Sequence, residues 1–247
     1  MSADILTVVW KEFREMFRGP GARFTMAVMI GVVCIMGVLL PLYLGVGAIA
    51  SPVTLLYCLW IPTLVVPGIV ADSFAGERER HTLETLLAGR LSDRAILLGK
   101  LCAPVLYGWG LTMIALLLGL ISVNLKAGAG HLLLFPALLA LSLVVMSFLA
   151  SWLFAGAGVL ISLRSPTVQK AQQTVGMLTL VPILPFIVLV LVLGDNKFGE
   201  LLARVMSWMP SNVNALVGGA MVVLLFSDLL LVRISLARFQ RARLVLD

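Results

Sequence analysis

The chain has 247 residues, of which 61% are hydrophobic and only 12% are charged, and its mean hydropathy is +1.09. It cannot cover its apolar surface with polar groups as a soluble globule does, so the composition predicts an integral membrane protein without room for a soluble catalytic domain. Its net charge of +6 is of the kind that positively charged membrane loops produce, and it does not imply a nucleic-acid partner.

No metal or cofactor site is predicted in this chain. Cys34, Cys58 and Cys102 lie inside or at the edges of apolar segments and form no C-x-x-C pair, so small buried apolar residues are the favoured interpretation. His81 and His131 are far apart and belong to no H-E-x-x-H motif.

The first 23 residues are expected to form an amphipathic interfacial helix. Between Asp4 and Arg18 the apolar residues recur with a helical period on one side, at Ile5, Val9, Phe13 and Met16. The segment is too short and too charged to span a bilayer. We expect it to lie in the membrane interface with Trp10 and Phe13 toward the acyl boundary, and the alternative is a helix packed on a soluble partner.

Residues 24–247 are expected to form a single all-α transmembrane domain with six spans. The predicted spans are Phe24–Leu44, Leu55–Val70, Leu101–Val123, Leu132–Leu163, Val175–Leu193 and Ala215–Val232. The second contains Pro62 and Pro67 and is expected to be kinked. The fourth is longer than a bilayer requires, so it must tilt, bend near Pro136 or project beyond the headgroups.

Residues 72–100 form the longest polar interval between apolar segments, and we expect a compact polar element beside the membrane. Leu83, Leu86 and Leu87 would line one face of a short helix, which Thr82 can cap and whose first turn Glu84 favours. A solvated loop does not need such a leucine face. The pattern favours a helix that docks on a partner outside the lipid.

The interval 194–214 is apolar but too short to span twice. It suggests a re-entrant pair of helices at the outer leaflet, or a simple amphipathic surface helix. Asp228 is the acidic residue inside a predicted span, which makes it a candidate intramembrane polar site. Because it lies near the end of the span, about one turn before Arg233, a structural role is the favoured interpretation, in which Asp228 either pairs with Arg233 or reaches the headgroups.

The distribution of Lys and Arg sets the orientation. Fifteen of the 18 basic residues fall in the N-terminal segment, 72–100, 162–174 and the C-terminal segment, and three fall in the alternate loops. Since the more basic loops stay in the cytoplasm, both termini and the interval 72–100 are predicted to be cytoplasmic.

The run FAGERERHTLETLL, from Phe74 to Leu87, is followed by SDRAILLGKL, from Ser92 to Leu101. Together they resemble the cytoplasmic segment between the second and third membrane helices of ABC-2 type transporter permeases, which tend to read FAxERExGTLExLL and then SRxEIxxGK. His81 stands where the family usually has Gly. Residues 88–90 stand where a Pro-containing turn is common.

The resemblance implies a permease subunit of an ATP-driven exporter in the cell membrane, which works by alternating access. It also implies a second permease, either another copy or a relative, and two ATPase subunits that bind ATP and Mg. The residues that it assigns to ATPase coupling are Glu77, Arg78, Glu79, Arg80, Thr82, Leu83, Glu84, Leu86 and Leu87. From the residues alone, Glu77 to Arg80 could equally form a solvated loop.

The chain has no G-x-x-x-x-G-K-[ST] motif, so it is not expected to be an enzyme and its energy source must be another chain. Three alternatives stay open. The chain could be a non-transporting anchor that signals the state of an ATPase. With less support, it could be an ion-coupled carrier or channel, or an intramembrane enzyme.

Overall fold

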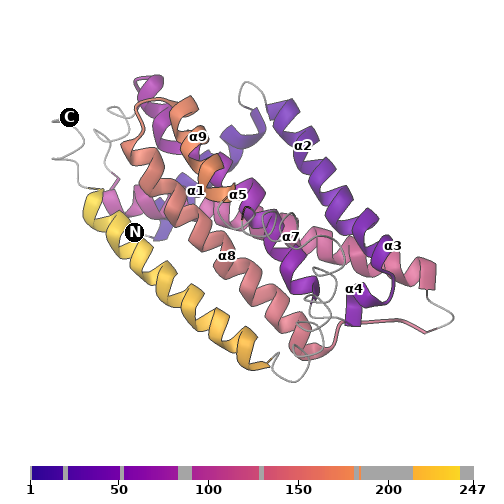
Figure 1. The fold of residues 1–247 in the computed structure, drawn as a ribbon. Coiled ribbons are helices and arrows are strands. Elements are labelled where there is room, and N and C mark those ends of the chain that lie inside the picture. The colour runs from indigo at the N-terminus through magenta and orange to yellow at the C-terminus, as the bar shows by residue number, and fades with distance from the viewer. Residues whose placement is uncertain are drawn as a thin grey trace.

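A computed structural model of the chain describes residues 2–18, 22–50, 53–82, 91–127, 131–180, 184 and 214–239. These residues form helices joined by short connections, and no strand occurs among them, which confirms the all-α expectation. The labelled helices are α1 (Ser2–Arg18), α2 (Ala22–Cys34), the π-helix η1 (Ile35–Leu39), α3 (Leu40–Leu44), α4 (Gly47–Ala50), α5 (Val53–Glu79), α7 (Asp93–Ala127), α8 (Ala137–Arg164) and α9 (Val168–Leu180) (Figure 1). A C-terminal helix covers Asn214–Arg238.

Five helical segments of the described chain are long and apolar enough to cross a membrane: Met26–Leu44, Leu59–Glu79, Asp93–Ala127, Ala137–Arg164 and Asn214–Arg238. They correspond to the first four and the last of the predicted spans. The predicted fifth span, 175–193, begins in α9, but most of it lies outside the described residues. The count of six therefore stays a prediction, as does the interval 194–214.

The first span contains a turn of π-helix between α2 and α3, at Ile35–Leu39. A π-turn inserts an extra residue into a helix and reorients the side chains that follow it. Here the first span touches α7 very closely, since a Cβ at Gly37 would lie 2.9 Å from backbone atoms of Ala115. Only glycine allows this approach of two backbones.

The core lies between α5, α7 and α8. Its largest cluster of buried residues joins the three helices through Val66, Val70, Phe74, Ile96, Leu97, Leu101, Val105, Ala155 and Val159, together with Phe239. The C-terminal helix runs alongside α8 (Figure 1), where Val217, Met221 and Leu224 pack against the cluster of Leu143 and Met146. Helices α5 and α8 thus form the centre of the bundle.

Pro136 explains the excess length of the fourth apolar segment. Its φ of −50° and ψ of 136° place it just outside α8, which begins at the next residue. The preceding residues are held to α7, because the Asn124 amide accepts a hydrogen bond from Leu133 N (2.7 Å) and donates one to Leu133 O (2.8 Å). The segment is therefore a short extended connection followed by a helix, rather than one bent span.

The expectation of a compact polar element over residues 72–100 is wrong for its two ends. Residues up to Glu79 continue α5, and residues from Asp93 onward belong to α7. Phe74, Ile96 and Leu97 are fully buried. Because they extend the apolar core past the hydrophobic segments, α5 and α7 each continue into one end of the charged interval. Residues 83–90 lie outside the described residues.

Candidate functional site

The charged end of the bundle contains a buried ion cluster. The Lys100 ammonium of α7 lies 2.9 Å from Glu12 Oε1 of α1 and 3.0 Å from Glu77 Oε1 of α5. It also donates a hydrogen bond to Ser73 O (2.8 Å) and lies 5.1 Å from the ring centroid of Phe74. Lys100 is only 1% exposed and Glu77 3%. One cation thus binds α1, α5 and α7 together.

Lys11 brings a second ammonium to the same cluster. It lies 2.7 Å from Glu77 Oε1, 3.4 Å from Glu15 Oε1 and 3.7 Å from Glu12 Oε1. Burial disfavours the charged form of Lys11, but the hydrogen bond to Glu77 and the nearby carboxylates outweigh it and raise the pKa of Lys11. Lys11 is therefore an ammonium at neutral pH.

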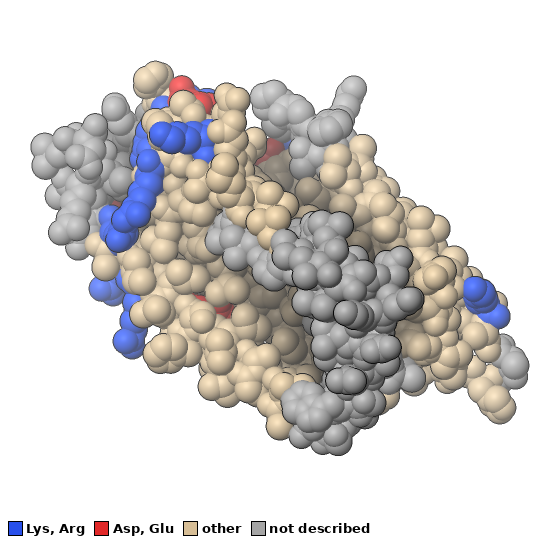
Figure 2. Space-filling view, viewed as in Figure 1, with Lys and Arg blue, Asp and Glu red and all other residues tan. Residues whose placement is uncertain are grey.

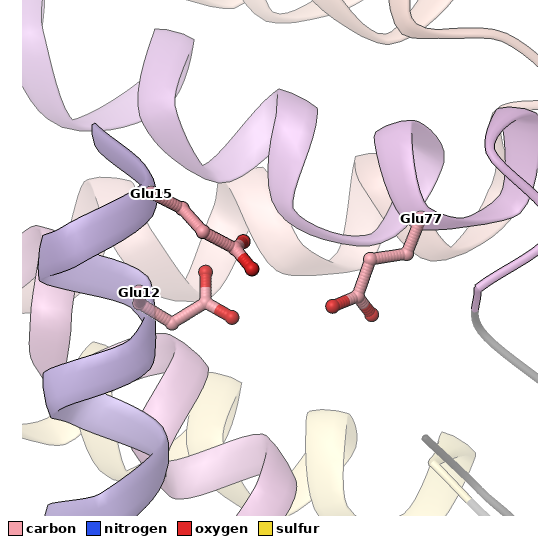
Figure 3. Close-up of side chains that lie close together, drawn as sticks. All are labelled: Glu12, Glu15 and Glu77. Carbon is pink, nitrogen blue, oxygen red and sulfur yellow. The ribbon is translucent and has the colours of Figure 1, made fainter. Parts of the chain in front are cut away.

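Three carboxylates converge at this point, Glu12 and Glu15 from α1 and Glu77 from α5 (Figure 3). Their ligand oxygens lie within 4.8 Å of one another, which is compact enough to hold a metal ion. However, the Lys11 and Lys100 ammonium groups already balance two of the three negative charges. The group is therefore best described as an ion-pair cluster that joins helices.

Gly99 sets the distance between α1 and α7. A Cβ at this position would lie 2.5 Å from Val8 Cβ, closer than side chains can approach. Val8 is 2% exposed, and Phe13 and Phe17 of α1 make edge contacts with Tyr107 of α7. The N-terminal helix is amphipathic as expected, but Phe13 packs on the chain's own α7. Its predicted orientation toward the acyl boundary is wrong.

Arg78 and Glu79 connect α5 to the next two helices. The Arg78 guanidinium donates hydrogen bonds to Ser165 O (2.7 Å) and Leu163 O (3.0 Å), two of the carbonyls that the end of α8 leaves unpaired. Glu79 Oε1 accepts a hydrogen bond from Val168 N (2.9 Å), the first residue of α9. Carboxylates are favoured at helix N-termini and guanidinium groups at C-termini.

The solvated-loop alternative for Glu77 to Arg80 is therefore wrong for the first three of these residues, which bind other helices. Arg80 fits it better, because its nearest described partner is Asp72, 3.8 Å away on the same helix, and both side chains are half exposed. Figure 2 shows Lys and Arg gathered at this end of the bundle, near α9. The described residues visible in the middle of that face include no Lys or Arg.

His81 ends α5 in an unusual conformation, with a φ of +54°. Thr82 N donates to Glu77 O (2.9 Å) and His81 N to Arg78 O (3.1 Å), the two hydrogen bonds of a Schellman motif. The position at its centre favours glycine, because a side chain in the left-handed region costs about 1–2 kcal/mol. This explains physically why glycine is usual here in the family that the sequence resembles.

Thr82 also donates a side-chain hydrogen bond to Glu77 O (3.3 Å), at the end of α5. The remaining predicted coupling residues, Leu83, Glu84, Leu86 and Leu87, lie outside the described residues. The predicted docking helix is therefore not tested by the structure. What the structure describes is where it is attached, at Thr82 after α5 and at Leu91 before α7.

Asp228 lies in the C-terminal helix and is 6% exposed. Neither of its carboxylate oxygens has a hydrogen-bond partner among the described residues. The expected ion pair with Arg233 does not form, and Arg233 is exposed. Residues five positions apart face different sides of a helix with 3.6 residues per turn, so the pairing was geometrically unfavourable.

Lys11, Glu12 and Lys100 were not identified from the sequence as members of a site. The helical spacing of these residues indicates that they are buried. Lys100 follows Ile96 and Leu97 by four and three positions and shares their buried face, and Glu12 follows Val8 by four. A charged residue in phase with an apolar face predicts a buried ion pair, because it cannot be buried alone.

These features define a class: a helical protein with several membrane-spanning segments, whose charged helix ends are bound together at one end of the bundle. Residues 41–221 match the ABC-2 family transporter proteins, from α3 to the C-terminal helix. The chain belongs to this family and is a multi-pass membrane protein of the transporter-permease type. A search of curated proteins gave no match to the chain.

Proposed function

We propose that the chain is the permease subunit of an ATP-driven exporter in the cell membrane, with both termini in the cytoplasm and with ATP hydrolysed by separate subunits. Membership of the ABC-2 family supports the transport role. The strongly asymmetric distribution of Lys and Arg between the predicted loops supports the orientation.

The observation that carries the proposal is the connection of five helices at the charged end. Three consecutive residues at the end of α5 make these connections. Glu77 binds both α1 and α7, Arg78 binds the end of α8, and Glu79 binds the start of α9. The unassigned interval 83–90 begins directly beyond this connection. A displacement of that interval would act on all five helices together, as coupling to an ATPase requires.

Leu83, Leu86 and Leu87 supply the docking face in this proposal, and a groove on the ATPase receives it. Two ATPase subunits bind ATP and Mg, and a second permease completes the path. Closure of the ATPase pair moves the docked segments together and shifts the path from an inner to an outer opening.

The chain's own Gly99-Lys100 pair does not serve as a phosphate-binding loop. Gly99 is covered by Val8, and the Lys100 ammonium is engaged by two carboxylates inside the bundle. A P-loop lysine must instead reach the phosphates of a bound nucleotide. This supports assigning hydrolysis to another subunit.

The cargo is proposed to be apolar or amphipathic. An apolar cavity of about 380 Å³ lies among the first turns of α8 and the C-terminal helix, and Leu139, Val217 and Met221 contribute to its lining. Ser142 and Asn214 are the polar side chains among the described residues of the lining, and none of these residues is charged, so the cavity suits an apolar or amphipathic molecule better than a small ion.

The division of labour is tested by purifying the full chain alone and together with its co-expressed ATPase. We expect no ATP hydrolysis from the chain alone and hydrolysis from the assembly. ATP-dependent movement of cargo into inverted vesicles then separates a transporter from a non-transporting anchor. Hydrolysis by the chain alone would contradict the proposal.

A further inference from the structure

Helix α1 has two chemically different faces. The inner face packs on α7 and carries Val8 and Glu12, which are 2% and 6% exposed. The outer face carries large apolar side chains that the described chain leaves largely uncovered, Leu6 at 68% and Trp10 at 72% exposure, and beside them Phe17, which is 48% exposed and also contacts Tyr107. Because Glu12 is ion-paired with Lys100, α1 cannot rotate to bury the outer face without breaking that buried pair.

A basic edge accompanies the apolar outer face. Arg14 and Arg18 are exposed, and they follow Trp10 at successive steps of four residues along the same side of the helix. The other three charged residues of this half of α1, Lys11, Glu12 and Glu15, take part in the ion-pair cluster with Glu77 and Lys100. The outer face therefore combines large apolar side chains, Trp10 among them, with two arginines that form no ion pair with the described residues.

The position of α1 relative to the first span limits what can cover this face. The helix ends at Arg18, and α2 begins at Ala22 and continues into the span Met26–Leu44. Four residue steps reach at most about 14 Å, so the C-terminal end of α1 lies within that distance of the start of an apolar helix. The C-terminal end of α1 therefore lies near the end of a membrane span, where lipid headgroups are found.

We infer that the outer face of α1 binds anionic phospholipids, with Trp10 at the boundary of the acyl chains and Arg14 and Arg18 on the phosphates. Amphipathic aromatic rings favour the membrane interface, and guanidinium groups match phosphate oxygens in pairs. The inference goes beyond the transport function. It requires only that the chain spans a membrane.

The test uses the full chain in detergent micelles, into which phosphatidylglycerol or the zwitterionic phosphatidylcholine is titrated while the thermal midpoint is followed. Wild-type protein should be stabilised at lower concentrations of phosphatidylglycerol than of phosphatidylcholine. Each arginine near an anionic surface contributes roughly fivefold in affinity, so Arg14→Gln with Arg18→Gln should weaken phosphatidylglycerol binding by roughly 25-fold. Lys170→Gln, an exposed lysine of α9, is the matched control and should change nothing.

A second measurement does not depend on the variant folding. Raising the salt concentration should weaken the phosphatidylglycerol effect on wild-type protein and leave that of phosphatidylcholine unchanged. Equal responses of the double variant and wild type would overturn the inference. A second result would also overturn it: the double variant keeps its lipid response but no longer binds an ATPase partner or no longer self-associates. The outer face of α1 would then be a protein interface.

Discussion

Lys100 and Glu12 stand 88 positions apart in the sequence, yet their side chains form a buried ion pair of 2.9 Å. The pair fixes the N-terminal helix to the start of α7, and Glu77 joins it from the end of α5. The three helices therefore meet at charged groups rather than only at apolar ones. Charged groups buried this deeply are strongly destabilising when one partner is removed.

Lys100→Met should destabilise the protein by about 3–5 kcal/mol, because it leaves the buried Glu12 and Glu77 carboxylates with only the partly exposed Lys11 ammonium beside them. The thermal midpoint of the purified protein in detergent measures this. Lys170→Met, at an exposed site, should change stability by no more than about 0.5 kcal/mol. Adding Glu12→Gln and Glu77→Gln to Lys100→Met should recover part of the loss. A midpoint equal to wild type in Lys100→Met would show that the cluster is not buried.

Gly99→Ala should destabilise the contact between α1 and α7 by about 1–3 kcal/mol, because the added methyl group meets Val8. Gly110→Ala in the same helix meets nothing within 4 Å. It should be neutral or stabilise by up to about 1 kcal/mol, since alanine favours a helix over glycine. The thermal midpoints of the two variants, compared with that of the wild-type protein, measure both effects. If the two substitutions have the same effect, α1 does not pack on α7 as described.

Arg78→Lys should cost about 1.5–3 kcal/mol although it keeps the charge. A lysine ammonium cannot reproduce the forked pair of hydrogen bonds to Ser165 O and Leu163 O. Arg80→Lys is the matched control, because Arg80 is half exposed and its pair with Asp72 is long. The comparison of unfolding midpoints would contradict this assignment if Arg80→Lys were the more damaging change.

Asp228→Asn should raise the thermal midpoint or leave it unchanged. The substitution keeps the shape of the side chain and removes the possibility of a buried, unpartnered negative charge. Asp72→Asn, at a half-exposed carboxylate, is the control. A marked loss of stability in Asp228→Asn alone would mean that a cation outside the described residues pairs with Asp228.

Much of the fold could be predicted from apolar segments, because a span needs only length and hydrophobicity. The first and last residues of the helices were harder to predict. Pro136 lies inside an apolar run, yet α8 begins only after it, and α5 continues to Glu79 although its last turns are charged. Hydropathy cannot show this, since the helix there is stabilised by partners distant in the sequence.

The contacts of the charged helix ends could not be predicted from the sequence. The charged run Glu77 to Arg80 was identified, whereas the choice of partner for each residue depends on helix packing. Lys100 was counted only as a basic loop residue, because a count of charges ignores helical phase. Asp228 was assigned to the wrong partner for the same reason, since Arg233 is close in sequence but not on the same side of the helix.

The most direct test of the proposed function replaces Leu86 and Leu87 with Asp and measures the ATPase that co-purifies with the chain from its native membranes. Each leucine that enters a groove contributes on the order of 1.5–3 kcal/mol, so the double substitution should lower complex formation by orders of magnitude. The thermal midpoint of the permease should be retained, because the predicted docking face lies outside the lipid. Co-purified ATP hydrolysis that falls to background while the permease stays folded is the predicted result. Wild-type yield of ATP hydrolysis from the double variant would contradict docking through this face.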